Sequence, residues 1–190
     1  MTGHSIDIAL SNNAVPWRDD MTLSAEAIEK LKKPLGADRV KTRQQSGRAV
    51  AYIEGYDAIN IANEVFGFDG WSYSVEGIDP LGGDEKRRLY QAVVRVIVGS
   101  AIRSDVGHGI SAGDSSEAQE TAIKGAVTDA LKRALRSFGA QFGNSLYDKD
   151  GPELAAPRCE KHGLDMQQGR TGKWGHVLED GKTPCFGEAA

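Results

Sequence analysis

The sequence is poor in cysteine and in aromatic residues, and it has no long apolar run. No apolar stretch approaches the roughly 20 residues that a membrane-spanning helix needs, so we expect no membrane partner. Residues 1–20 contain no basic flank followed by an apolar stretch, which indicates that no signal peptide is present. These absences predict a protein of a reducing compartment, where its two cysteines would stay unpaired and metal binding becomes their leading role.

An excess of positive charge is also missing, because 27 acidic residues outnumber 23 basic ones and the formal net charge is −4. Taken alone, this balance argues weakly against a nucleic-acid partner. Nucleic-acid binding depends on a local basic surface, however, and acidic residues elsewhere can hide such a surface in the sum. The position of the cations therefore decides the question.

Hydrophobic patterning and turn residues predict an α+β fold, with an antiparallel sheet covered by helices on one face. The expected helices are 25–33, 56–66 and a long one from Ser115 or Ser116 to about 138, and the expected strands are 49–54, 71–75, 89–98 and 101–106. Residues 80–84 and 107–113 are glycine-rich and are expected to form a turn and a loop. We divide the chain into an irregular segment 1–24, a main domain 25–150, a linker 151–157 and a C-terminal segment 158–190.

The long predicted helix has two different faces. Lys132, Arg133 and Arg136 fall within an arc of about 100° on a helical wheel. Apolar residues occupy the remaining face: Ala126, Val127, Ala130, Leu131, Ala134, Leu135 and Phe138. A solvated helix face would explain a charge run of this kind, but acidic partners one turn away are scarce. The cluster therefore favours an anionic partner such as a phosphate backbone.

Three segments resemble the Rad52 family of single-strand annealing proteins. They are KGAVTDALKRALRSFGAQFGNSLYDKD (124–150), AYIEGYDAINIANEVFGFDGWSYSV (51–75), and YQAVVRVIV followed by SDVGHGIS. Together they cover roughly residues 30–150, in the family's order. The resemblance implies a β-β-β-α module that assembles into a homo-oligomeric ring and binds single-stranded DNA in a positively charged groove. Because the chain ends soon after this region, we expect a minimal phage or bacterial version in the cytoplasm, with the nucleus less favoured.

The resemblance also assigns roles to individual residues. Arg43, Lys132, Arg133 and Arg136 match the family's phosphate contacts in the inner groove. Arg88 matches a cation of a second, outer DNA site. Another lysine of that outer site aligns near Gly113 and is absent here, and Lys86 and Arg87 are the candidate replacements.

The implied function is the annealing of complementary strands in recombination and repair, without ATP, a nucleotide cofactor or enzymatic chemistry. An annealer must hold the backbone and leave base edges free, which favours cations over aromatic platforms. Aromatic residues are only 7% of the chain, and no GxxxxGK[ST] motif is present. Tyr52 could stack on a base, but packing is the favoured role of this strand aromatic.

Two other functions stay open. One is a strand-protecting protein without annealing activity. The other, from a different class, is a metal-dependent nuclease that uses the acids near the glycine-rich segment: Asp105, Asp114, Glu117 and Glu120. Acids at the start of a helix more often stabilise the helix dipole, which disfavours this second alternative.

Both cysteines and two of the four histidines lie in the C-terminal segment. Cys159-x₂-His162 and His176-x₈-Cys185 form two pairs of soft ligands, as a structural tetrahedral zinc site requires. A segment of about 30 residues has too little core to fold alone, and a metal would supply the missing stability. The alternative is a basic tail with chance cysteine and histidine. The partner of this C-terminal segment is expected to be either DNA or a single-strand-binding or other replication protein. DNA would be contacted through Arg158, Lys161, Arg170 and Lys173.

Overall fold

The computed structural model describes residues 22–45, 47–84, 86–149, 152–169, 173–178 and 180–186. The expected irregular segment 1–24 thus lies almost entirely outside the described residues, as does Arg170. The helices are α1 (Ala25–Lys32), α2 (Gly55–Phe66) and α3 (Ser116–Arg136). The 3-10 turn η1 (Ala37–Arg39) precedes β2, and η2 (Ala140–Phe142) and η3 (Asn144–Tyr147) follow α3. The strands are β1 (Leu35–Gly36), β2 (Val40–Gln45), β3 (Arg48–Ile53), β4 (Trp71–Asp84), β5 (Arg87–Val98), β6 (Ala101–Ile110), β7 (Leu154–Ala155), β8 (Gln167–Gln168), β9 (Trp174–Val177) and β10 (Pro184–Cys185). No described helix is both long and apolar enough to cross a bilayer.

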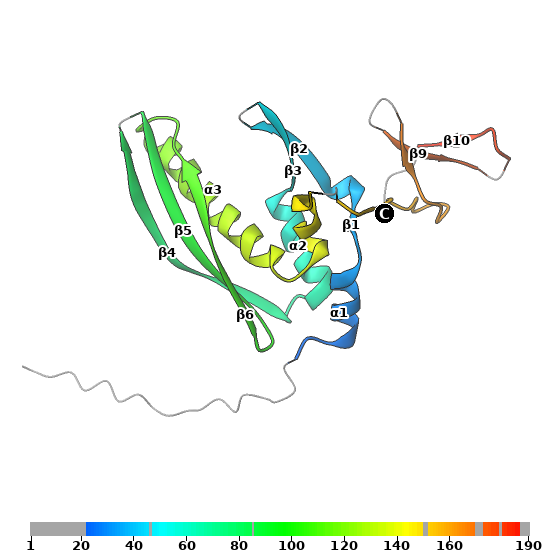
Figure 1. Cartoon of the computed structure of the whole chain (residues 1–190), viewed down its shortest axis with the longest axis horizontal. Coiled ribbons are helices and arrows are strands. Elements are labelled where there is room, and N and C mark those ends of the chain that lie inside the picture. Colours follow the sequence, from blue (N-terminus) through cyan, green and yellow to red (C-terminus); the bar gives the residue numbers. More distant parts are fainter. Residues whose placement is uncertain are drawn as a thin grey trace, which may run out of the picture.

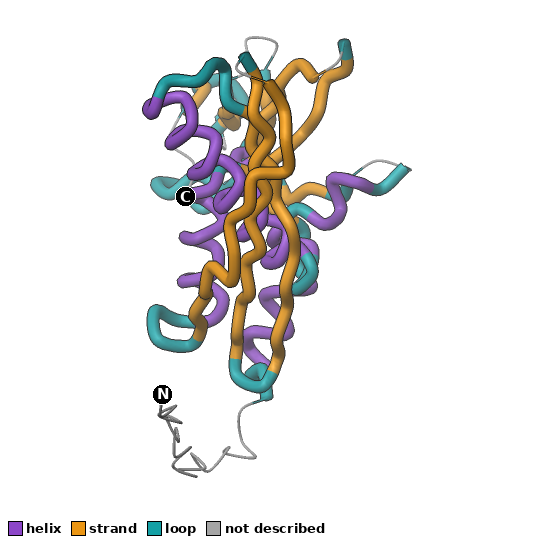
Figure 2. The backbone as a smooth tube through the Cα atoms, turned by 90° about the vertical axis from the view of Figure 1, so that its left-hand side faces the viewer, coloured by secondary structure: helices purple, strands orange, loops and turns teal. Residues whose placement is uncertain are grey.

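The main sheet is antiparallel, with strand order β4-β5-β6. Helix α3 lies along one face of this sheet, and α1 and α2 lie beside its C-terminal half (Figure 1). Figure 2 shows the three strands side by side with the helices on one side. The mixed fold class and the β-β-β-α order are therefore as predicted.

Close packing between α3 and the sheet depends on small residues. Alternate residues of β5, from Tyr90 to Val98, are buried beneath α3. A fully or nearly fully buried row of alanines on α3 faces them: Ala122, Ala126, Ala130 and Ala134. On β6, a Cβ added to Gly107 would lie 2.1 Å from the backbone nitrogen of Ala130, and one added to Gly109 would lie 1.9 Å from the carbonyl oxygen of Ala122. Glycine is therefore required wherever β6 runs against the helix backbone.

The structure corrects the expected turn at 80–84 and part of the expected loop at 107–113. Residues 107–110 belong to strand β6 rather than to a loop, because the two glycines are needed for contact with α3 and not for a turn. Residues 80–84 also continue strand β4, and the chain turns between Asp84 and Arg87 instead. Irregularities in register near Val75 and Pro80 let the long strand accommodate its glycines and proline.

A second hairpin, made of β2 and β3, stands beside α3 (Figure 1). Strand β2 was not predicted, because its residues VKTRQQ are polar and largely exposed and show no apolar alternation. Strand β7 pairs in parallel with β1, so part of the expected linker lies against the main domain. The division of the chain into domains remains a prediction.

Candidate nucleic-acid interface

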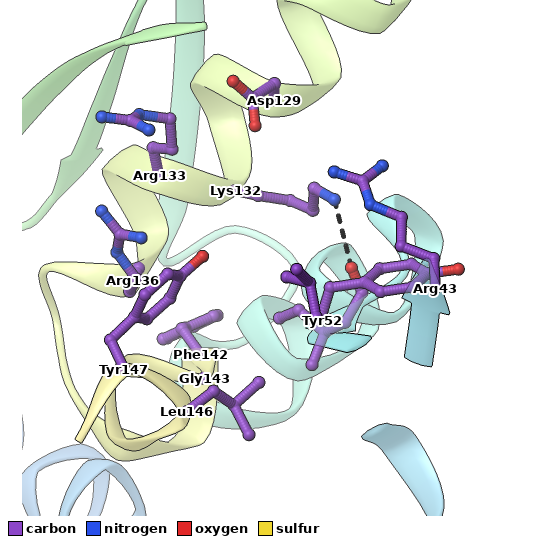
Figure 3. Close-up of a pocket in the computed structure, with 12 residues that line it drawn as sticks. Arg43, Tyr52, Asp129, Lys132, Arg133, Arg136, Phe142, Gly143, Leu146 and Tyr147 are labelled. Atoms are coloured by element: carbon purple, nitrogen blue, oxygen red, sulfur yellow. Dashed lines mark hydrogen bonds between the residues drawn. The ribbon is translucent and has the colours of Figure 1, made fainter. Parts of the chain in front are cut away.

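The four cations expected in the inner groove lie around one pocket. Arg43 comes from β2, whereas Lys132, Arg133 and Arg136 come from the last turns of α3 (Figure 3). The β2–β3 hairpin forms one wall, and residues 142–147 form the floor. Asp129 is the only acidic side chain among the described residues that line it. The pocket is thus locally cationic, although the whole chain is acidic.

Of the three α3 cations, Arg133 is exposed, Arg136 is half-buried, and Lys132 is half-buried and fixed by a hydrogen bond. Its Nζ donates a hydrogen bond to the backbone carbonyl of Ile53 over 3.2 Å, the dashed line in Figure 3. Burial lowers the pKa of Lys132, and the nearby carboxylate of Asp129 partly opposes this effect. The hydrogen bond therefore fixes the position of the ammonium group. A phosphate bound beside it would stabilise the charged form of Lys132, which burial has deprived of part of its hydration.

Tyr52 lines the pocket and contacts two of its cations. Its ring lies 5.3 Å from the Arg43 guanidinium and 5.5 Å from Lys132 Nζ. Its hydroxyl donates a 3.0 Å hydrogen bond to Glu54, which raises the pKa of Tyr52. The ring is thus already engaged with two cations, so it positions them rather than offering a free platform for a base.

The two arginines at the end of α3 have different partners. Arg133 Nε donates to Asp105 on β6 over 3.1 Å, and this bond raises the pKa of the guanidinium. Arg136 lies over the ring of Tyr147, with 4.4 Å between guanidinium carbon and ring centroid. Sequence reasoning missed Tyr147, which contacts Arg136 only because the chain folds back after α3.

The three cations assigned to an outer site lie away from this groove. Lys86 and Arg87 are exposed at the β4–β5 turn, and Arg88 forms a 2.8 Å ion pair with Asp114 before α3 begins. Three of the four groove cations, Lys132, Arg133 and Arg136, lie near the other end of α3, and the helix axis from Ser116 to Lys132 is roughly 24 Å long at about 1.5 Å per residue. The structure therefore separates the seven residues into two sets, as the resemblance implied, while their DNA-binding roles remain predictions.

The acids considered for a nuclease do not form a cluster. Asp105 pairs with Arg133, Asp114 with Arg88, and Glu120 with Lys124. Glu117 lies in the exposed first turn of α3. Within the part of the chain that the structure describes, these acids form no group of three or more metal ligands. The geometry gives the nuclease alternative no support.

The C-terminal segment does contain such a group. One ligand atom from each of Cys159, His162, His176 and Cys185 lies within 4.8 Å of the others. Burial raises the pKa of the Cys159 thiol, but the two imidazoles and the backbone N–H groups of Lys161 and His162 outweigh it and lower the pKa to about 6. The four residues predicted as metal ligands are therefore close together, and the group could hold a metal ion.

Comparison with known proteins identifies the region that contains the groove. A model of the Rad52/22 family of double-strand break repair proteins matches residues 24–155. The chain is 47% identical over 129 residues to the DNA repair and recombination protein RAD52 of Eremothecium gossypii, covering 64% of this chain and 30% of that protein. It is 43% identical over 135 residues to RAD52 of Saccharomyces cerevisiae, covering 67% and 29% respectively. It is 40% identical over 129 residues to the DNA repair and recombination protein rad22 of Schizosaccharomyces pombe, covering 63% and 28%.

The matched region thus spans less than a third of each of these relatives. All three are fungal proteins, so they give no support to the expected phage or bacterial source or to disfavouring the nucleus. The family match covers both cation sets and the whole β-β-β-α unit, and it excludes the Cys/His group. Because it extends over most of the sequence, this chain belongs to the Rad52/22 family of double-strand break repair proteins.

Proposed function

We propose that this chain binds single-stranded DNA in the groove of Arg43, Lys132, Arg133 and Arg136 and anneals complementary strands without hydrolysing a nucleotide. The observation that carries the proposal is the convergence of these four cations from two separate elements onto one pocket. Phosphates are the ligands that closely spaced arginine and lysine side chains prefer. The family membership and the recombination and repair names of the relatives support the same role.

The groove suits an annealer better than a protein that only protects single strands. Protection without sequence preference relies on aromatic rings that stack on bases. Both tyrosine rings here already contact cations, Tyr52 with Arg43 and Lys132 and Tyr147 with Arg136, although Tyr147 stays 63% exposed. Contacts of this groove would therefore fall on the phosphate backbone and leave the base edges free to pair. Base stacking in the new duplex, about 1.4 kcal/mol per step, would supply the driving force.

The proposed active form is a homo-oligomeric ring. Strand β4 is an edge of the main sheet, and it exposes Tyr73, Val75, Ile78 and Leu81. Strand β6 forms the other edge and exposes Ile102 and Ile110. An unpaired edge of this length with apolar side chains needs a cover, which a head-to-tail neighbour would provide. A ring would also repeat one weak site along a strand and raise avidity without new contacts.

Mixing labelled complementary oligonucleotides with the full chain tests the proposal directly. Duplex should form faster than in protein-free controls, without ATP and equally with or without magnesium. Binding of each single strand without faster duplex formation would favour the protecting alternative, and magnesium-dependent fragments would favour a nuclease. Electron microscopy with and without single-stranded DNA should show rings, whereas monomers under both conditions would refute the oligomeric part.

A further inference from the structure

We propose that Cys159, His162, His176 and Cys185 bind one zinc ion, and that this ion holds the C-terminal segment in its folded form. The site lies outside the region shared with the Rad52/22 family, so it is independent of the annealing function. Its four ligands come from three pieces of chain: a tight turn at 159–162, strand β9 and strand β10.

The geometry fits tetrahedral coordination. Zinc with two sulfur and two nitrogen ligands, at about 2.3 Å and 2.0–2.1 Å, places neighbouring ligand atoms roughly 3.3–3.8 Å apart. Cys159 Sγ and His162 Nδ1 are 3.6 Å apart, and the four ligand atoms all lie within 4.8 Å of one another. In the β9–β10 hairpin, His176 and Cys185 are direct cross-strand partners, which brings the second pair of ligands to the first. Two thiolates would neutralise the ion.

The hydrogen bonding of His176 points independently to a missing ligand. Its Nε2 is buried and, among the described residues, has no hydrogen-bond partner, although a buried polar atom of this kind normally has one. The other ring nitrogen, Nδ1, lies 3.4 Å from the carbonyl oxygen of Val177. A histidine whose one nitrogen meets a carbonyl while the other binds a metal is the usual arrangement at a zinc site.

The packing of the segment explains why an ion is needed. Of its described residues from 158 onward, only Cys159 and Met166 are buried, and neither belongs to the main hydrophobic core. Its β-structure consists of a single isolated bridge and a three-stranded sheet of very short strands. So few buried side chains cannot offset the conformational entropy lost on ordering about 30 residues. A bound zinc ion can, because its binding free energy becomes folding free energy.

Metal analysis of the full chain, purified without chelator, tests the site. We expect about one zinc per chain, a loss of nearly all of it in Cys159→Ser and in His176→Ala, and full retention in the matched control His108→Ala, whose histidine is exposed on β6. Cobalt added in place of zinc should give the visible absorption of tetrahedral Co(II) and a thiolate-to-cobalt charge-transfer band. Three outcomes would each overturn the proposal. They are a protein without metal that does not take up added zinc, a disulfide between Cys159 and Cys185, and zinc content that is unchanged in both ligand variants.

Hydrogen exchange tests the structural role separately. The amides of Cys159, Gly163 and Leu178 donate to carbonyls within the segment and should lose protection when zinc is chelated, while amides of α3 should keep theirs. Unchanged protection in the segment after complete removal of zinc would refute the structural role. Since annealing by the groove does not enter either measurement, failure here leaves the proposed function untouched.

Discussion

Replacing the three groove cations of α3 should change the salt dependence of DNA binding in a calculable way. For single strands, log K falls with log salt by about 0.7 for each phosphate neutralised, because each contact releases counterions. The variant Lys132→Met, Arg133→Gln, Arg136→Gln should therefore have a slope about 2.1 shallower than the unmodified chain. Over a fourfold increase in salt, the unmodified chain should lose roughly 20-fold more affinity than the variant.

The structure refines this value, because Arg133 is already paired with Asp105 at 3.1 Å and can share only part of its charge with a phosphate. A change in slope between about 1.4 and 2.1 is therefore the expected range. Fluorescence anisotropy of a labelled oligothymidylate over a salt series measures it. Lys124→Gln is the matched control, because Lys124 lies on the same helix but outside the pocket and should leave the slope unchanged. Equal slopes for the triple variant and the control, with both proteins folded by circular dichroism, would refute the groove assignment.

Three further changes probe the surroundings of the groove, the second site and the packing. Asp105→Asn should raise the affinity for single-stranded DNA by about two- to fivefold, which corresponds to the energy of an exposed ion pair, because it frees Arg133. Unchanged or weaker binding would contradict the idea that the Asp105 carboxylate competes with a DNA phosphate for Arg133. Arg88→Ala should slow annealing more than it weakens binding of one strand, and equal losses in the two assays would place Arg88 in the primary groove or in a purely structural role. Gly109→Ala should lower the free energy of unfolding by about 1–3 kcal/mol in a denaturant titration, because the new Cβ would lie 1.9 Å from the carbonyl oxygen of Ala122 on α3. The control Gly125→Ala should not destabilise the protein, because nothing lies within 4 Å of a Cβ added there.

The sequence predicted the helices and strands that are defined by the periodicity of apolar residues or by capping residues. The predicted strand 89–98 and the predicted helix start at Ser115 or Ser116 both agree with the structure, in which β5 spans Arg87–Val98 and Ser115 caps α3. The helical wheel correctly placed the buried face of α3 and grouped its three cations. Strand β2 escaped prediction because its pairing with β3, rather than apolar periodicity, defines it.

The missed features all depend on contacts between distant segments. The pairing of Arg133 with Asp105 requires both the register of β6 and the docking of α3, neither of which residue spacing contains. Glycines at 107 and 109 were interpreted as a loop, although glycine in a strand can equally mark a close approach of another backbone. The half-burial of Lys132 comes from the β2–β3 hairpin, which a wheel of α3 alone cannot include.

Contacts within the protein already hold the groove cations in place. Lys132 is bonded to a carbonyl, Arg136 lies on a tyrosine ring, and Arg43 is bonded to Gln45 and lies over Tyr52. Ordering these long side chains therefore costs little when a strand binds. The acids Asp105 and Asp129, in contrast, weaken the expected attraction for phosphate, because they reduce the net positive charge of the groove. Both properties suit the proposed function. Cations in fixed positions would hold the phosphate backbone so that the base edges face the second strand. Weak binding at each groove, repeated around a ring, would retain a single strand and still allow the finished duplex to dissociate.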